Sequence, residues 1–291
     1  MVYNHSNEHM PTKGIEKQEV EVIIVDRVQK RGEVVPKEIR DTVSARYHCI
    51  TKAVNREFWN STNDTLHSLY VGSYGRGTAI DTSDVDMLVI LPQNVYEQHD
   101  RLKGNGQSRL LQAVKGAIQS AYPRSNIRAD GQVVVIDFAD GIMFEVVPAF
   151  EREYVYPYYK KEFIYPDTNN GGNWKSTNPK AEQEAMNEKN DSSNGLLKDT
   201  CRHIRRIHNE KFSSYHLSGI LIDSFVYRAI QNWRWAPPGR EGSASGTYEN
   251  VLYDYYNANK WSVLYAPGSG MSVDTDDYFC LEKILKYMAG K

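Results

Sequence analysis

Apolar residues recur at three- and four-residue steps after Pro36, which is the period of a helix with one buried face. That face would carry Ile39, Val43, Tyr47, Ile50, Val54 and Phe58. The pattern predicts a long amphipathic helix from Pro36 to about Asn60 that packs along one side of a core. A further helix is expected from about Gly106 to Tyr122.

Short apolar runs near these helices indicate strands. Residues 66–71 (LHSLYV) end at a Gly-Ser pair, and residues 84–91 (DVDMLVIL) are apolar enough to be buried on both faces. Residues 133–138 (VVVIDF) and 142–147 (IMFEVV) flank an Ala-Asp-Gly turn and predict a hairpin. The first half of the chain is therefore expected to be mixed α/β.

The character of the sequence changes after Phe150. Residues 154–180 are dense in Tyr, Pro, Gly and Asn, and this composition predicts a loop-rich connector. Helical patterns follow near residues 179–192, 195–210, 215–232, 247–259 and 277–288.

These patterns predict an α+β fold of two lobes with the site in the cleft between them, because pockets concentrate at domain interfaces. The expected parts are a polar N-terminal arm over residues 1–35, a core over residues 36–165 and a mainly helical lobe over residues 166–291.

The composition is that of an ordinary globular protein. Of the 291 residues, 40% are hydrophobic and 25% charged, and a net charge of -2 gives no global attraction to a polyanion. Cys49, Cys201 and Cys280 lack the spacing of a disulfide framework or a zinc site. No apolar run approaches the roughly 20 residues that span a bilayer, and the N-terminus lacks an apolar leader. We expect a cytoplasmic protein without a membrane segment or a long nucleic-acid partner.

Two aspartates stand at the head of the second apolar run. In a strand, residues i and i+2 point to the same side, so Asp84 and Asp86 project together. Adjacent carboxylates repel unless a cation lies between them or one is protonated, and such pairs suit Mg²⁺ or Mn²⁺ bound together with substrate phosphates. Glu145, a lone acid inside an apolar run, is the candidate third ligand, and Asp137 near the hairpin end is its rival. Three such acids predict a two-metal site for phosphate chemistry.

The Gly72-Ser73 pair fits the same chemistry. A glycine lets the backbone approach a phosphate closely, and the following amides and the serine hydroxyl can bind a triphosphate at the start of a helical turn. A Gly-Ser pair or an Asp-x-Asp by itself is a weak signal, but their spacing here, with a third acid on a later strand, favours a functional site. Arg76 and Thr78 either contact substrate or hold the loop in shape.

Residues 72–86, GSYGRGTAIDTSDVD, resemble the signature of the polymerase-β-type nucleotidyltransferase superfamily, and in particular its cGAS/DncV-like branch, the CD-NTases. Further blocks resemble that branch in the same order, namely residues 171–180, 196–209, 213–225 and 261–270. The likeness runs from about residue 36 to the end. It implies a nucleotidyltransferase core with a mixed sheet and helices, joined to a helical lobe that binds nucleotide.

The resemblance places the family's catalytic and metal-binding acids on Asp84, Asp86 and Glu145, and it implies two Mg²⁺ or Mn²⁺ ions. Its phosphate-binding turn falls on Gly72 and Ser73. Much of the superfamily has aspartate where this chain has Glu145, whose side chain is one methylene longer.

Three further substrate-binding residues follow from the resemblance. Arg205 stands where the family commonly has a lysine that contacts the triphosphate. The adjacent Arg206 would take that place if the match were shifted by one residue. Ser214 resembles a serine that binds the donor phosphates, and Tyr215 resembles an aromatic residue that stacks on the base. Each has a structural alternative: an exposed helix face for Arg205, a helix N-cap for Ser214 and a core position for Tyr215.

A bacterial member of this branch would join nucleoside triphosphates (ATP, GTP or a pyrimidine nucleotide) into a cyclic di- or trinucleotide second messenger and release pyrophosphate. The resemblance implies a monomer that takes part in anti-phage signalling, with a downstream effector that is not a stable partner. Two alternatives stay open. One is a nucleotidyltransferase that makes linear oligoadenylate or modifies RNA or protein, which the near-neutral charge disfavours for RNA. The other is a catalytically inactive nucleotide- or RNA-sensing module, which the complete set of three acids disfavours.

Overall fold

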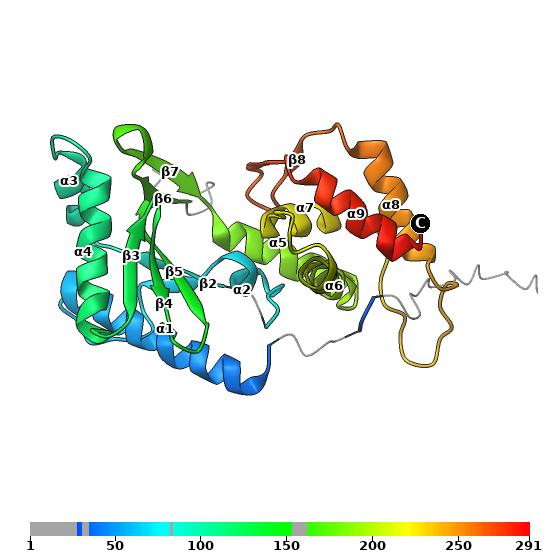
Figure 1. Cartoon of the computed structure of the whole chain (residues 1–291), viewed down its shortest axis with the longest axis horizontal. Coiled ribbons are helices and arrows are strands. Elements are labelled where there is room, and N and C mark those ends of the chain that lie inside the picture. The colour runs from blue at the N-terminus through cyan, green and yellow to red at the C-terminus, as the bar shows by residue number, and fades with distance from the viewer. Residues whose placement is uncertain (1–27, 31–34, 82–83, 153–161) are drawn as a thin grey trace, which may run out of the picture.

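The computed structural model describes four stretches of the chain, which are residues 28–30, 35–81, 84–152 and 162–291. Most of the predicted arm over residues 1–35 therefore lies outside the described residues. The large sheet lies at one end of the molecule with helices against it, and the other end is mainly helical, so the two lobes expected from the sequence are visible in Figure 1. Among the described helices, none combines the length and apolarity needed to cross a bilayer.

Two helices cover the sheet of the N-terminal lobe. They are α1 (Lys37–Phe58) and α4 (Gly106–Ala121), and they confirm the two helices predicted for this half. Asn105 caps α4 by accepting a hydrogen bond from the Ser108 amide at 2.9 Å. The helices share one buried cluster with the sheet, to which they contribute Val43, Ile50, Val54, Leu110, Val114 and Ile118.

A sheet of seven strands in the described residues forms the centre of this lobe. The strands are β1 (Ser68–Tyr70), β2 (Val85–Ile90), β3 (Asn126–Asp130), β4 (Val133–Asp137), β5 (Met143–Arg152), β6 (Glu162–Asp167) and β7 (Asn173–Thr177). They pair in the order β1-β2-β5-β4-β3, and β6 and β7 continue from the end of β5. All pairs are antiparallel except β2 and β5, which run parallel and bring Asp86 opposite Glu145. The predicted hairpin between β4 and β5 is confirmed, with Gly141 in the left-handed region at φ 86°.

Helices pack around a second buried cluster in the C-terminal lobe. Those described are α5 (Pro179–Ser192), α6 (Leu196–Lys211), α7 (Gly219–Ala229), α8 (Thr247–Asn259) and α9 (Tyr278–Ala289). A small ribbon of β8 (Leu264–Tyr265) and β9 (Ser272–Val273) lies beside α7. The helix predictions for this half are confirmed, except that α7 begins four residues later and ends three residues earlier than expected.

The prediction of a loop-rich connector over residues 154–180 was partly wrong. Its described part contains β6 and β7, separated by a 3₁₀ turn, η1 (Asn169–Gly171). Aromatic and β-branched residues favour strands, and Phe163 packs in a small cluster with Leu88 and Ala149. The sheet therefore continues to Thr177. The pattern analysis also did not identify α3 (Gln93–Asp100) or the short strand β3.

Candidate active site

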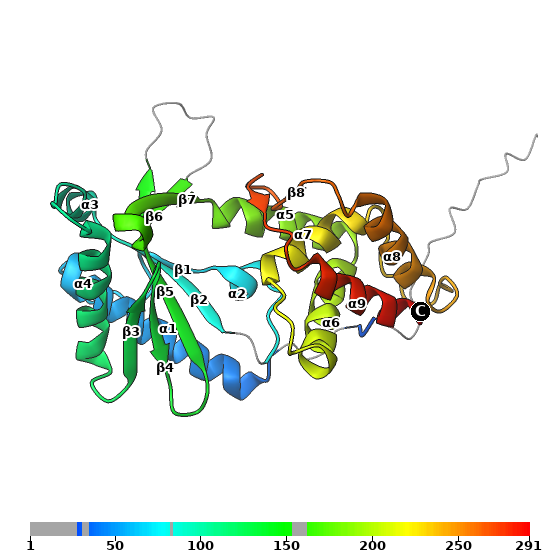
Figure 2. The same ribbon diagram turned by 45° about the horizontal axis from the view of Figure 1, so that its top comes forward.

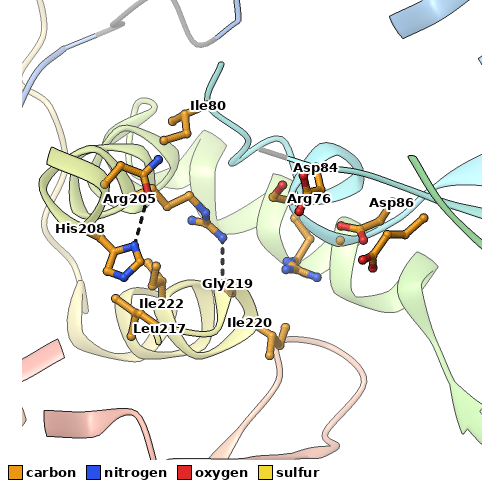
Figure 3. A pocket seen from close by; sticks show the side chains of 14 residues that line it. Arg76, Ile80, Asp84, Asp86, Arg205, His208, Leu217, Gly219, Ile220 and Ile222 are labelled. Carbon is orange, nitrogen blue, oxygen red and sulfur yellow. Dashed lines mark hydrogen bonds between the residues drawn. The ribbon is translucent and has the colours of Figure 1, made fainter. Parts of the chain in front are cut away.

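An open pocket of about 390 Å³ lies between the two lobes, a volume suited to a small molecule. Asp84 and Asp86 of the N-terminal lobe stand on one wall, and Arg205 and His208 of α6 stand across from them (Figure 3). Of the eight site residues predicted from the sequence, six line this pocket: Gly72, Ser73, Asp84, Asp86, Glu145 and Arg205.

The three acids come together because β2 and β5 are parallel neighbours. Asp86 stands opposite Glu145 in the register of the two strands, and Asp84, two residues earlier, lies beside Asp86 (Figure 3). The rival acid Asp137 does not line the pocket. It accepts hydrogen bonds from Arg128 and Asn126, so an ion pair accounts for its charge.

Burial and mutual repulsion raise the pKa values of these carboxyl groups. Burial, followed by the charge of Glu145, raises the pKa of Asp86 to about 6. Burial and the charge of Asp137 raise the pKa of Asp84, and burial and the charge of Asp84 raise the pKa of Glu145. Arg76 lowers the pKa of Asp86 only in part. The acid wall therefore favours a bound cation.

Within the described ranges, no three His, Cys, Asp or Glu side chains are gathered closely enough to enclose a metal ion by themselves. Mg²⁺ and Mn²⁺ do not need such a cage, because they are held by a few carboxylates together with water and substrate phosphates. The all-carboxylate donors Asp84, Asp86 and Glu145 fit these hard cations better than zinc. The residues present are consistent with metal that binds together with substrate.

Gly72 allows the loop to lie against the acids. It begins α2 (Gly72–Arg76), the short helix that lies between the sheet and the C-terminal lobe in Figures 1 and 2, which confirms the predicted helical turn. Its φ is 55°, and a Cβ at this position would collide with Oδ2 of Asp86. The backbone amide of Ser73 donates a hydrogen bond to Asp86. A side chain at position 72 would push the loop away from the acids.

Arg205 belongs to a buried ion network that ties the lobes together. Its Nη1 donates to Oδ1 of Asp223 at 2.7 Å, and its Nη2 donates to the carbonyl of Gly219 at 2.9 Å. Oδ2 of Asp223 accepts from Nε of Arg76 at 2.7 Å and from Oγ1 of Thr78 at 2.9 Å. Although burial opposes it, the charges of Arg205 and Arg76 bring the pKa of Asp223 down to about 2. Arg76 and Thr78 therefore hold the loop, which was one of the two alternatives, and Arg76 also lines the pocket, so its contact with substrate stays a prediction.

The structure also distinguishes Arg205 from its neighbour. Arg205 is buried and lines the pocket, whereas Nη1 of Arg206 donates to Oε1 of Gln29 at 3.1 Å. The alternative of an exposed helix face does not hold for Arg205. Its three hydrogen bonds, including a longer one to the Cys201 carbonyl, leave two of its five N–H donors unused within the described residues.

Ser214 and Tyr215 are not among the residues that line the pocket. Both lie in the loop between α6 and α7, and the carbonyl of Tyr215 accepts a hydrogen bond from Nε2 of His208, a lining residue, at 2.8 Å. Tyr215 is 41% exposed, which excludes the core alternative, and the N-cap of α7 is Ser218 rather than Ser214. Contact of Ser214 and Tyr215 with nucleotide stays a prediction.

Pattern analysis missed much of the C-terminal wall. His208 and Asn209 follow Arg205 at three- and four-residue steps on α6, and this spacing could have identified them as neighbours on one helix face. Leu217 and Ile220 also line the pocket. Such common apolar residues carry no local signal, because only the packing of the lobes selects them.

Comparison with known proteins identifies the family. The sequence profile of the Second Messenger Oligonucleotide or Dinucleotide Synthetase (SMODS) domain matches residues 21–190, more than half of the chain. The chain belongs to the SMODS family. As a SMODS protein it is a nucleotidyltransferase that synthesises a cyclic oligonucleotide second messenger, as its resemblance to the CD-NTases implied. No curated protein matches the chain significantly.

Solved structures share the fold of this SMODS protein. The CdnE c-UMP-AMP synthase of Rhodothermus marinus has 15% identity and a TM-score of 0.59, over 85% of this chain and 90% of that chain. The CdnE cyclic dinucleotide synthase of Elizabethkingia meningoseptica has 14% identity and a TM-score of 0.60, over 87% and 92%. The CD-NTase CdnG of Bradyrhizobium diazoefficiens has 12% identity and a TM-score of 0.54, over 87% and 83%. These similarities confirm the α+β fold with its helical C-terminal lobe.

Proposed function

We propose that the pocket between the lobes joins nucleoside triphosphates into a cyclic di- or trinucleotide, with Asp84, Asp86 and Glu145 as the catalytic and metal-binding acids. The observation that carries this proposal is the placement of three mutually repelling carboxylates together, beside the Gly72 turn, with Arg205 across the pocket from Asp84 and Asp86. A nucleoside triphosphate that carries divalent cations would match both walls, since it brings positive charge to the acids and phosphate oxygens to the arginine.

Ligands named in the solved structures support this substrate class. The Rhodothermus marinus enzyme is described with Apcpp and Upnpp, and the Elizabethkingia meningoseptica enzyme with GTP and Apcpp. The Bradyrhizobium diazoefficiens CdnG is described in complex with GTP. We propose ATP, GTP or a pyrimidine nucleotide as substrates of this chain, because these three solved structures together hold purine and pyrimidine nucleotides.

The chain's own residues would bind and orient the two nucleotides. Gly72 and Ser73 would bind the donor triphosphate, and the two unused N–H donors of Arg205 would contact its phosphates. The acceptor ribose hydroxyl would lie near Asp86 and Glu145. Two divalent ions held by the three acids would lower the pKa of the acceptor hydroxyl and neutralise charge on the leaving pyrophosphate.

The reaction forms one bond and breaks one. The acceptor hydroxyl oxygen attacks the α-phosphorus of the donor, a new phosphate ester forms, the bond to pyrophosphate breaks and the hydroxyl proton leaves to solvent. For a cyclic dinucleotide, the linear product then binds again so that its free hydroxyl attacks its own remaining triphosphate, and the second pyrophosphate leaves as the ring closes. For a trinucleotide, one further nucleotide is added with release of its pyrophosphate before the ring closes, so three pyrophosphates leave in all.

Purified protein incubated with the four radiolabelled nucleoside triphosphates and Mg²⁺ or Mn²⁺ tests the proposal. After phosphatase treatment, mass spectrometry should find a resistant product that contains two or three nucleotides and no terminal phosphate, and the Asp84→Ala/Asp86→Ala variant should lack it. Phosphatase-sensitive chains alone would indicate a linear synthase, and label on the protein would indicate protein nucleotidylation. Either result would contradict cyclisation.

We also propose that the product acts in anti-phage signalling, on the resemblance to the CD-NTases. Bacteria that carry the wild-type gene with its neighbouring genes should survive phage challenge better than bacteria that carry the Asp84→Ala/Asp86→Ala variant. Equal survival of both strains against a broad phage panel would contradict this role.

A further inference from the structure

A second pocket, of about 470 Å³, lies near the end of α5 and the start of α6. Three basic residues line it, Lys30, Lys198 and Arg202, together with Trp235 and the acid Asp199. We propose that this pocket is a second binding site, separate from the catalytic pocket, for a phosphate-bearing anion of about nucleotide size. The proposal concerns a site that the synthase reaction does not use.

The positive charge of this pocket is not neutralised by its own acid. Both carboxylate oxygens of Asp199 are already bound, Oδ1 by Nη2 of Arg202 at 2.6 Å and Oδ2 by Nε1 of Trp235 at 2.8 Å. The Lys30 ammonium lies 5.5 Å from the centre of the Trp235 ring, which places a second cation at the rim. After Asp199 is counted, two positive charges remain on the described residues that line the pocket.

Lys198 points most directly to an anion as the ligand. Its Nζ donates to the neutral amide oxygen of Asn187 at 2.6 Å, and among the described residues it forms no ion pair with a carboxylate. Burial and the nearby charge of Arg202 lower the pKa of Lys198, and Asp191 offsets this only in part. A half-buried ammonium without an acidic partner is costly, and a bound anion would remove that cost.

Side chains, rather than the start of α6, would hold the anion. The amides of Leu197 and Lys198 donate to Oγ of Ser193 and to Oδ1 of Asn190, each at 3.1 Å. These backbone donors are already used, so the bonds to phosphate oxygens must come from the basic side chains. Lysine and arginine are the usual side chains for this purpose.

Two of the same cations also contact Gly77, at the end of α2. Nη1 of Arg202 donates to the carbonyl of Gly77 at 2.8 Å, and a Cβ at Gly77 would lie 2.9 Å from Nζ of Lys198. Gly77 is the C-cap of α2, and the next amide, of Thr78, donates to the carbonyl of Ser73 at 2.9 Å. An anion in the second pocket would therefore bind to residues that support the phosphate-binding turn of the first.

Lysine footprinting tests this site without requiring turnover. No lysine is among the described residues that line the catalytic pocket, so protection of Lys30 and Lys198 reports on the second pocket. The full chain would be acetylated briefly in EDTA with inorganic tripolyphosphate, with ATP or with neither, and analysed by mass spectrometry. We expect several-fold protection of Lys30 and Lys198, while Lys211 at the other end of α6 keeps its reactivity. Protection by both probes would indicate recognition of polyphosphate, and protection by ATP alone would indicate that the nucleoside also binds.

Variants separate binding from unfolding. Arg202→Gln should abolish the protection, and Arg101→Gln, an exposed arginine after α3, should retain it. If Arg202→Gln does not fold, Lys30→Gln at the pocket rim serves instead, with Lys198 as the reporter. Unchanged reactivity of Lys30 and Lys198 with either probe, or equal protection of Lys211, would overturn the proposal. Because the readout is binding, it is independent of whether the chain proves to be a cyclic or a linear synthase.

Discussion

Replacing Asp86 by asparagine should stabilise the metal-free protein. The pKa of Asp86 rises from 3.8 to about 6 in the folded chain, a difference of about two units. One unit corresponds to about 1.4 kcal/mol, so ionised Asp86 costs the fold up to about 3 kcal/mol, and relaxation reduces this to roughly 1–3 kcal/mol. Asparagine keeps the shape and an acceptor for the Ser73 amide but removes the charge. For a protein of this size, the gain corresponds to a melting temperature higher by several degrees.

The pH dependence has a defined sign. Because the pKa of Asp86 is higher in the folded state, the protonated form is favoured by folding. The penalty is absent below about pH 3.8, grows as the pH rises towards 6 and is constant above that value. The advantage of Asp86→Asn should therefore be small in acid and reach its plateau at neutral pH.

Thermal unfolding in EDTA across this pH range measures the effect. Asp41→Asn is the control, because Asp41 is exposed and paired with Lys37 on α1, so its loss should not stabilise the protein. Added Mg²⁺ should stabilise the wild type more than Asp86→Asn. A variant that is no more stable than the wild type at neutral pH, or one whose advantage does not change with pH, would refute the reasoning.

Three further substitutions test other parts of the site. Gly72→Ala should abolish nucleotide transfer, because the added Cβ collides with Asp86. Gly104→Ala is the control, since Gly104 has a φ of 85° in open space and the substitution imposes backbone strain alone. Equal losses of activity for the two variants in a product assay would contradict this. Asp223→Asn should lower the free energy of unfolding by about 3–5 kcal/mol in denaturant titrations, because buried Arg205 loses its ion-pair partner and buried Arg76 keeps only its pair with Glu182. Asp41→Asn at an exposed ion pair should cost less than about 1 kcal/mol, and similar losses for the two variants would contradict the buried network. Tyr215→Ala should raise KM for nucleoside triphosphates about tenfold and leave kcat nearly unchanged, as expected for a stacking residue; an unchanged KM would remove Tyr215 from the site.

Sequence patterns correctly predicted the elements that are determined by neighbouring residues in the chain. The apolar spacing of α1, the apolar run of β2 and the Asp-Gly turn before β5 each predicted an element that the structure confirms. The shared side of Asp84 and Asp86 follows from their spacing alone. That Asp86 faces Glu145 depends on the parallel pairing of distant strands, which pattern does not specify. Its place as a lone acid in an apolar run made Glu145 a candidate, and the resemblance to a family placed the third acid on the same residue.

Asp223 shows the limit of such reasoning for charged residues. It is a lone acid in the apolar segment GILIDSFV, so it has the same signal as Glu145 in its apolar strand. In the structure it binds Arg76 and Arg205 and lies outside the pocket lining. A buried acid in the sequence therefore indicates a partner, but only the fold tells whether that partner is an arginine or a metal ion.

The measurement that tests the central claim most directly is product formation by matched single variants of the acids. Wild type, Asp86→Asn, Glu145→Gln and Asp137→Asn would be compared with Mg²⁺ and the four nucleoside triphosphates, after confirmation that each is folded. The account predicts the same phosphatase-resistant cyclic product from wild type and Asp137→Asn, and none from Asp86→Asn or Glu145→Gln. Normal product from Glu145→Gln, or its loss in Asp137→Asn, would contradict the assignment of the three acids.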